Sequence, residues 1–251
     1  MSRNAARLRA RGSASGRLRA IGLVVAIVGV VIGATPVESA LAAGPSFAVV
    51  QQGTVFLGSG ASSAVVKFGS AAHAGDLLIA TGMIYPSNAT PTGPAGFTSA
   101  GSTPGPAGHS AGAVWFKVAT GSESSFTFAQ PAASGNWSQF TVTEVSGLGS
   151  SVAVDGASAW QSNGSSVSGY TQTYGSTPLA TGELAFAFFH ASSATTQTTP
   201  TGWSLVNAPT SGNDQTGAYL QATGTTPPTI TTAGLTPTGS YTAGMIIFHS
   251  T

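Results

Sequence analysis

Residues 113–128, AVWFKVATGSESSFTF, contain the pattern that decides the fold class of this chain. Side chains alternate through AVWFKVA with a period of two, as expected when successive residues point to opposite faces of a sheet. The turn-forming letters TGSE follow, and SSFTF then alternates again. We therefore predict a β-hairpin here, and a weaker copy of it at residues 218–224 and 229–231.

Further strands are indicated on both sides of this stretch. Residues 77–85, LLIATGMIY, form an almost continuous apolar run, which is typical of a strand buried on both faces. The segment up to residue 112 is rich in proline and glycine and excludes a helix. Other strands are expected at residues 47–56, 64–68, 136–147, 152–154, 157–161, 167–174, 183–190, 203–206 and 241–249. No segment after residue 42 has a helical period, so the fold class is all-β.

Several motifs occur twice in the same order. GDL at residues 75–77 recurs as GEL at 182–184, and PAGF at 94–97 recurs as PTGW at 200–203. The segment ATG also recurs, and the spacing between copies stays between 103 and 107 residues. This pattern predicts an internal duplication with pseudo-repeats at about 70–147 and 178–251. We expect the two repeats to share one two-sheet β-sandwich of jelly-roll type, with two separate small domains as the alternative.

The order of these motifs resembles that of a widespread group of proteins. In the order of its motifs the chain looks like secreted bacterial and phage-associated β-sandwich (jelly-roll) proteins. These motifs are GDLLIA, a PAGF loop, AVWFKVATGSESSFTF, GELAFAF, PTGW and a terminal apolar strand. The resemblance covers essentially all of residues 43–251. It implies a sandwich fold and an extracellular or virion-surface location, and it implies no catalytic residues.

The N-terminal segment has the features of an export signal. Six arginines lie within the first 20 residues, and the uncharged apolar run IGLVVAIVGVVIGA follows at residues 21–34. An ALA site at residues 40–42 completes the pattern of a secretory signal peptide, residues 1–42. An uncleaved anchor is the alternative, but this run of 14 residues is shorter than the ~20 that span a bilayer. We therefore expect a secreted, extracellular protein whose one β-sandwich domain covers residues 43–251.

Charge and cysteine content narrow the classes of partner. After residue 42 only two lysines remain, against six acidic residues, which gives a net charge of 2 − 6 = −4. This segment lacks the basic surface of a nucleic-acid-binding protein. The chain has no cysteine, so a disulfide framework is excluded and stability must come from the core.

Catalytic and metal motifs are weak. Residues 108–112, GHSAG, match G-x-S-x-G, but hydrolases place this serine on a strand-to-helix turn, whereas a strand follows here. Glu144 and Glu183 are the candidates for a glycosidase carboxylate pair, although Glu183 and Asp76 have equivalent places after a glycine and suit turn-side acceptors of backbone N–H groups. The four histidines have no ligand spacing, so no metal or cofactor is expected. The chain is interpreted as a non-enzyme.

Carbohydrate recognition has the best support in the sequence. The uncharged segment 157–176 contains aromatic residues whose faces can stack on a sugar ring, together with amides that can bond its hydroxyls. The predicted ligand-binding residues are Trp160, Gln161, Tyr170, Gln172 and Tyr174. The alternative is that these aromatic side chains pack across strands.

These observations predict a secreted, non-catalytic binding or adhesion module that recognises glycans or other cell-surface polymers. The alternative is a structural or decoration subunit of a cell-surface or virion assembly that associates with copies of itself, and a hydrolase is a third interpretation. Exposed aromatic residues together on one face would favour the glycan binder. An apolar face or open edge strands would favour the assembly subunit.

Overall fold

The computed structural model describes residues 47–58, 60–86, 89–104, 110–131, 137–155, 159–167, 169–175, 178–192, 201–207, 214–221, 227–233 and 239–251. Fifteen strands and no helix occur in these ranges, which confirms the all-β prediction. The predicted signal peptide, residues 1–42, lies outside the described residues.

The first large sheet has five antiparallel strands, in the spatial order β1-β7-β3-β5-β4. Its strands are β1 (Ala48–Leu57), β7 (Trp137–Ser146), β3 (Leu77–Tyr85), β5 (Ala111–Val118) and β4 (Thr98–Thr103). The predicted doubly buried strand is β3, and all its residues up to Ile84 are buried. Strand β4 lies in the region expected to be a loop, because its residues are small and polar and carry little hydrophobic signal.

The second large sheet runs β12-β13-β11-β15-β8, and β9 also pairs with β15. Its strands are β12 (Ser204–Asn207), β13 (Asp214–Gln221), β11 (Glu183–Ser192), β15 (Gly239–Ser250), β8 (Val152–Val154) and β9 (Ala159–Val167). Every pairing in it is antiparallel.

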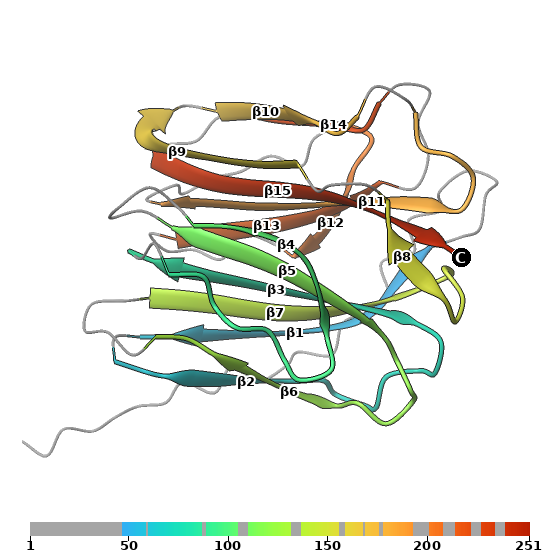
Figure 1. Ribbon diagram of the computed structural model, residues 1–251. Helices are drawn as coiled ribbons and strands as arrows, with labels where there is room; N and C mark the ends of the chain where they lie inside the picture. Colours follow the sequence, from blue (N-terminus) through green and yellow to red (C-terminus); the bar gives the residue numbers. More distant parts are fainter. Residues whose placement is uncertain are drawn as a thin grey trace, which may run out of the picture.

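Two small sheets complete the fold. One pairs β2 (Ser63–Lys67) with β6 (Ser125–Ala129), and the other pairs β10 (Gly169–Thr173) with β14 (Thr229–Ala233). Figure 1 shows four stacked layers, with β2 and β6 outside the five-stranded sheet and β10 and β14 outside the second large sheet. The sequence-based expectation of two packed sheets did not include these outer layers.

Both predicted hairpins are wrong, and for the same reason. Strand β5 belongs to the five-stranded sheet, but β6 pairs with β2 in the outer layer. In the second copy, β13 belongs to a large sheet, whereas β14 pairs with β10. The alternating pattern identified the strands correctly. It does not specify the partner, and the segment 119–124 is long enough for the chain to cross between layers instead of turning back within one sheet.

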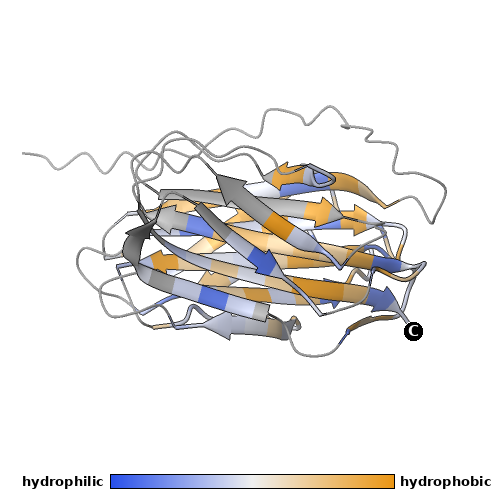
Figure 2. Cartoon of the chain, turned by 90° about the horizontal axis from the view of Figure 1, so that it is seen from above, coloured by the Kyte–Doolittle hydropathy of each residue, from blue (hydrophilic) through white to orange (hydrophobic). Residues whose placement is uncertain are grey.

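Three hydrophobic clusters hold the layers together, and Figure 2 shows hydrophobic residues distributed along the strands that form them. The central cluster lies between the two large sheets and includes Ile79 and Phe186. A second cluster joins the five-stranded sheet to the β2–β6 layer through residues such as Phe128 and Phe140. A third joins the other large sheet to the β10–β14 layer around Phe189. Each large sheet is therefore buried on both faces, which accounts for its continuous apolar strands.

The repeated motifs adopt the same local conformation. Asp76 donates its backbone N–H to the carbonyl of His73 at 3.2 Å, and Glu183 does the same to Ala180 at 3.1 Å. The intervening glycines have φ angles of 91° at Gly75 and 88° at Gly182, in the left-handed region that favours glycine. Strand order also repeats, because adding eight to each label of β1-β7-β3-β5-β4 gives β9-β15-β11-β13-β12, and β2-β6 becomes β10-β14.

Candidate functional site

The predicted glycan-binding aromatic residues do not share one face. Trp160, on β9, packs against the central cluster between the large sheets. Its ring lies over Gly244 of β15, where an added Cβ would be 2.8 Å from Trp160 Cζ3. Tyr174 packs instead against the outer cluster on the opposite face of that sheet, and its hydroxyl donates to the carbonyl of Asp155. Burial raises the pKa of Tyr174, and the charges of Asp155 and Glu183 raise it further.

The remaining residues of that predicted set are also scattered. Gln161 is exposed, and its Oε1 accepts a hydrogen bond of 3.4 Å from the hydroxyl of Tyr241. Gln172 is buried in the outer β10–β14 layer. The side chain of Tyr170 lies outside the described residues. The structure therefore does not bring the described members of the set together on one surface.

The described part of the GHSAG motif, residues 110–112, lies at the contact between the large sheets. Ser110 is buried, its Oγ has no hydrogen-bond partner, and its carbonyl accepts a 2.6 Å bond from Thr242 Oγ1. At Gly112 an added Cβ would be 2.9 Å from the ring of Phe188, so the glycine permits the close approach of the two sheets. His109 lies outside the described residues. Ser110 Oγ therefore lacks the hydrogen-bonded base that activates a nucleophilic serine in the triads of hydrolases.

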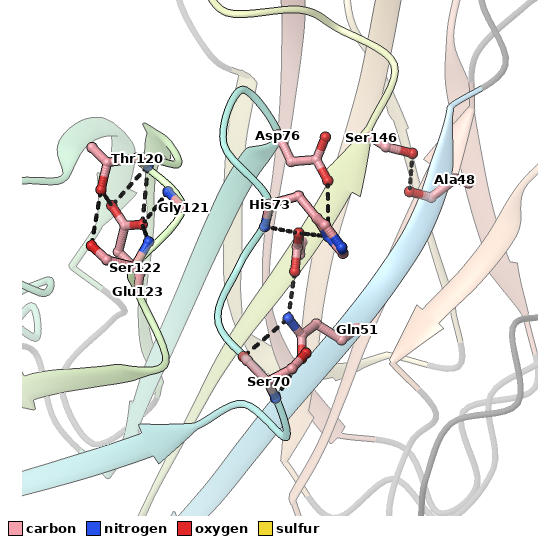
Figure 3. A network of polar contacts seen from close by, with 11 residues as sticks. Ala48, Gln51, Ser70, His73, Asp76, Thr120, Gly121, Ser122, Glu123 and Ser146 are labelled. Carbon is pink, nitrogen blue, oxygen red and sulfur yellow. Dashed lines mark hydrogen bonds and ion pairs between the residues drawn. The ribbon is translucent and has the colours of Figure 1, made fainter.

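A polar network that the sequence did not predict joins β1, β7 and the turn before β3. Its centre is Glu144 of β7, which is fully buried. Glu144 Oε1 accepts bonds from the backbone N–H of His73 at 2.7 Å and from His73 Nδ1 at 2.9 Å, and its Oε2 accepts a 2.6 Å bond from Gln51 Nε2. Gln51 also contacts Ser70. Figure 3 shows the side chains of Gln51, His73 and Asp76 turned toward one another.

Asp76 brings a second carboxylate to this network. Its Oδ2 lies 3.8 Å from His73 Nδ1, and the ligand-type atoms of His73, Asp76 and Glu144 all lie within 4.8 Å of one another. Burial, a hydrogen bond with Glu144 and the negative charge of Glu144 raise the pKa of Asp76 to about 6, although His73 opposes this shift. For Glu144 burial acts in the same direction, but the hydrogen bonds from His73 and Gln51 outweigh it and lower the pKa below its usual value.

The predicted role of the two equivalent turn carboxylates is confirmed for only one of them. Glu183 Oε2 accepts the backbone N–H of Ala180 at 2.6 Å, as a turn-side acceptor should. Asp76 occupies the equivalent place, but its carboxylate lies beside His73 and Glu144. The only sequence signal for this network was a lone glutamate within the apolar pattern of residues 137–146, because the strand register that brings Glu144 to the turn cannot be read from sequence.

A second carboxylate network closes the turn between β5 and β6. Glu123 pairs with Lys117 at 2.6 Å and accepts backbone N–H bonds from Thr120, Gly121 and Ser122. Burial opposes ionisation of Glu123, but the bond from Lys117 and those from Thr120 lower its pKa to about 2. This carboxylate is fully engaged within its own turn, so we assign it a structural role.

Two large aromatic side chains are exposed on adjacent strands. Phe56 of β1 is 51% exposed and Trp137 of β7 is 55% exposed. Phe56 lies opposite Gln139, two residues along β7 from Trp137, so both rings project from the same face as diagonal neighbours. The ring of Trp137 lies beside Gly58, the residue that follows β1, because an added Cβ there would be 3.9 Å from Trp137 Cζ3. Gln139, on the same face, is buried and neither atom of its amide has a hydrogen-bond partner.

Comparison with known proteins assigns no function to this arrangement. No known protein family matches the chain, and no curated protein matches it in sequence. Within the described ranges there is no helix long and apolar enough to cross a membrane. The resemblance to secreted β-sandwich proteins therefore stays a prediction.

Proposed function

We propose that this protein is a secreted, non-catalytic binding module that recognises glycans through Phe56 and Trp137. The observation that carries the proposal is the pair of exposed rings on one face of adjacent strands β1 and β7. Its extracellular location rests on the predicted export signal.

The chemistry of this surface suits a sugar. An aromatic face stacks on the apolar C–H side of a pyranose ring, and nearby amide or hydroxyl groups bond the sugar hydroxyls. Thr54 of β1 is exposed on the same face as Phe56, and its hydroxyl, which bonds Thr141 Oγ1 at 3.0 Å, has capacity for one further hydrogen bond to a sugar. No Lys or Arg lies among the described residues of β1 or β7, so the surface favours a neutral ligand over an anionic one.

The new location replaces the one predicted from sequence. Trp160 and Tyr174 pack on opposite faces of a large sheet and offer no shared surface.

A glycan array probed with the purified protein tests this proposal. We expect wild-type protein to bind one class of neutral glycan, and Trp137→Ala and Phe56→Ala each to weaken binding about tenfold or more. Leu205→Ala is the matched control, because Leu205 is another exposed apolar residue, on β12, and its loss should leave binding unchanged. Equal loss in the Leu205 variant, or no glycan bound by folded wild-type protein, would refute the assignment.

A structural subunit that associates with itself is the second candidate, and the position of β1 favours it. Strand β1 ends the order of the five-stranded sheet, so its outer edge has no partner strand within that sheet. An edge strand with an exposed aromatic residue can pair with another copy. Light scattering across a concentration series distinguishes the two, since assembly that Phe56→Lys abolishes would support the subunit.

We further infer that the architecture arose by internal duplication of one jelly-roll-like sandwich. Support comes from the matching strand orders and from the matching turns at Gly75 and Gly182. In this interpretation each repeat supplies one large sheet and one two-stranded layer, and the two repeats pack through their large sheets as the subunits of an isologous dimer would.

A further inference from the structure

The strongest unassigned feature is the arrangement of nitrogen and oxygen atoms at the turn before β3. His73 Nδ1 lies 2.9 Å from Glu144 Oε1 and 3.8 Å from Asp76 Oδ2. In a tetrahedral zinc site with bonds of about 2.1 Å, neighbouring ligand atoms are about 3.4 Å apart. These two separations lie on either side of that value, and all three ligand-type atoms lie within 4.8 Å of one another, so a cation can enter once the side chains adjust.

The charge of the cluster also fits a cation. Two carboxylates adjoin, one of them fully buried, and within the described part of the chain their only ion-pair partner is His73. Buried carboxylates are retained when they are paired or coordinate a metal. Neither lysine of the described residues neutralises these carboxylates. Lys117 pairs with Glu123 in the neighbouring turn, and Lys67 forms no ion pair with Asp76 or Glu144.

The fold itself does not require this cluster. The second large sheet repeats the turn at Ala180–Glu183, and the position on β15 that corresponds to Glu144 is Ile247, which is buried in an apolar cluster. The same backbone therefore forms with an aliphatic residue at this position. A buried glutamate supported by dedicated partners at one of two equivalent positions indicates a role beyond folding.

We propose that His73, Asp76 and Glu144 bind one divalent transition-metal ion, with Zn²⁺ the first candidate. One imidazole and two carboxylates suit zinc, whereas Ca²⁺ prefers six or more oxygen ligands. Gln51 holds the far oxygen of Glu144 and so acts as the supporting partner that orients a ligand. The exposed His73 gives the ion a route from solvent, and solvent fills the remaining coordination position.

Binding of the ion replaces the hydrogen bond between His73 and Glu144. His73 Nδ1 and Glu144 Oε1 now share a hydrogen bond, so the metal must take the Nδ1 lone pair while the ring proton resides on Nε2. Glu144 Oε1 keeps its bond from the backbone N–H of His73.

Isothermal titration of the purified, tag-free protein with ZnCl₂ tests the site. We expect one Zn²⁺ per chain, a raised melting temperature with zinc, and at least about tenfold weaker binding of CaCl₂. His73→Ala and Asp76→Asn remove ligands at positions outside the core, so both variants should fold and bind zinc about tenfold to a hundredfold more weakly. His249→Gln is the matched control and should bind like wild type.

Three results would overturn the proposal. The first is no zinc binding by folded wild-type protein at concentrations up to about 1 mM. The second is undiminished affinity in both His73→Ala and Asp76→Asn. The third is an equal loss in the His249 control, which would indicate unspecific binding to histidines.

Discussion

The two halves of the molecule treat one equivalent position in opposite ways. In the first half Leu78 of β3 pairs with Glu144, and in the second the equivalent Ala185 of β11 pairs with Ile247. Glu144 and Ile247 are both buried on the outer face of a large sheet. Glu144 is the centre of a polar network, whereas Ile247 lies in an apolar cluster. The comparison teaches that the two halves share the strand order and the turn, whereas the described residues contain the carboxylate cluster in the first half.

Placing a carboxylate in the second half is expected to give one of the two largest effects. Ile247→Glu buries a charge in a cluster of aliphatic and aromatic side chains, without the amide and backbone donors that surround Glu144. We expect a loss of about 4 kcal/mol in the free energy of unfolding, measured by urea denaturation. Ile247→Val should cost about 1 kcal/mol. A loss no greater than that of the valine control would mean that the second half tolerates the charge.

The reverse exchange should cost less. Glu144→Ile gives the first half the residue of the second, but it leaves the backbone N–H of His73 and the side-chain amide of Gln51 without their acceptor. We expect a loss of about 2 kcal/mol by the same measurement. Adding Gln51→Val should recover part of the lost free energy of unfolding, because the unsatisfied side-chain amide of Gln51 is then removed. No recovery in the double variant would show that the cost comes from packing instead of from unsatisfied donors.

Sequence pattern predicted the strands far better than their partners. The run at residues 77–85 matches β3 residue for residue, because a doubly buried strand needs continuous apolar side chains. The hairpins failed because alternation in SSFTF reports that β6 has one buried face and does not report which sheet covers it. The polar strand β4 has almost no hydrophobic pattern in its sequence, because an edge strand of small residues buries little apolar surface.

The sites were harder to predict than the fold. The segment around Trp160 contains aromatic residues and amides, but whether a ring points to solvent depends on the packing of β9 over Gly244, a glycine 84 positions away. Likewise, Glu144 meets His73 only through the pairing of β7 with β3. Composition predicts the kind of side chain at a site, whereas long-range register determines which side chains meet.

Turn carboxylates provide a smaller contrast between the halves. Glu123 binds Lys117 and several backbone N–H groups, whereas Glu183 accepts a bond from Ala180. We expect Glu123→Gln to lower the free energy of unfolding by about 2 kcal/mol at pH 7, and Glu183→Gln by about 1 kcal/mol. Urea denaturation of both variants beside wild type measures the difference.

The pH dependence of the Glu123 effect has a definite sign. The pKa of Glu123 is lowered from 4.5 to about 2 in the folded protein, so its contribution is fully present above pH 4.5 and is lost as the pH falls toward 2. The gap between wild type and Glu123→Gln should therefore close between these values. A gap that stays constant down to pH 2.5 would show that the glutamine loses packing rather than a charged acceptor.

Trp137 should give the smallest effect on stability, and the contrast with Trp203 explains why. Trp203 of the second half is buried, and its Nε1 donates to the carbonyl of Thr229 at 2.9 Å, so its indole joins β14 to the large sheet. Trp137 of the first half leaves more than half of its surface in solvent. Trp137→Ala should change the free energy of unfolding by less than about 1 kcal/mol, whereas Trp203→Ala should cost about 4 kcal/mol.

If Trp137→Ala unfolds the protein as readily as Trp203→Ala does, its ring supports the fold, and any loss of glycan binding in that variant would then say nothing about a binding face. A stable variant that no longer binds would instead identify the exposed ring as a contact with the ligand.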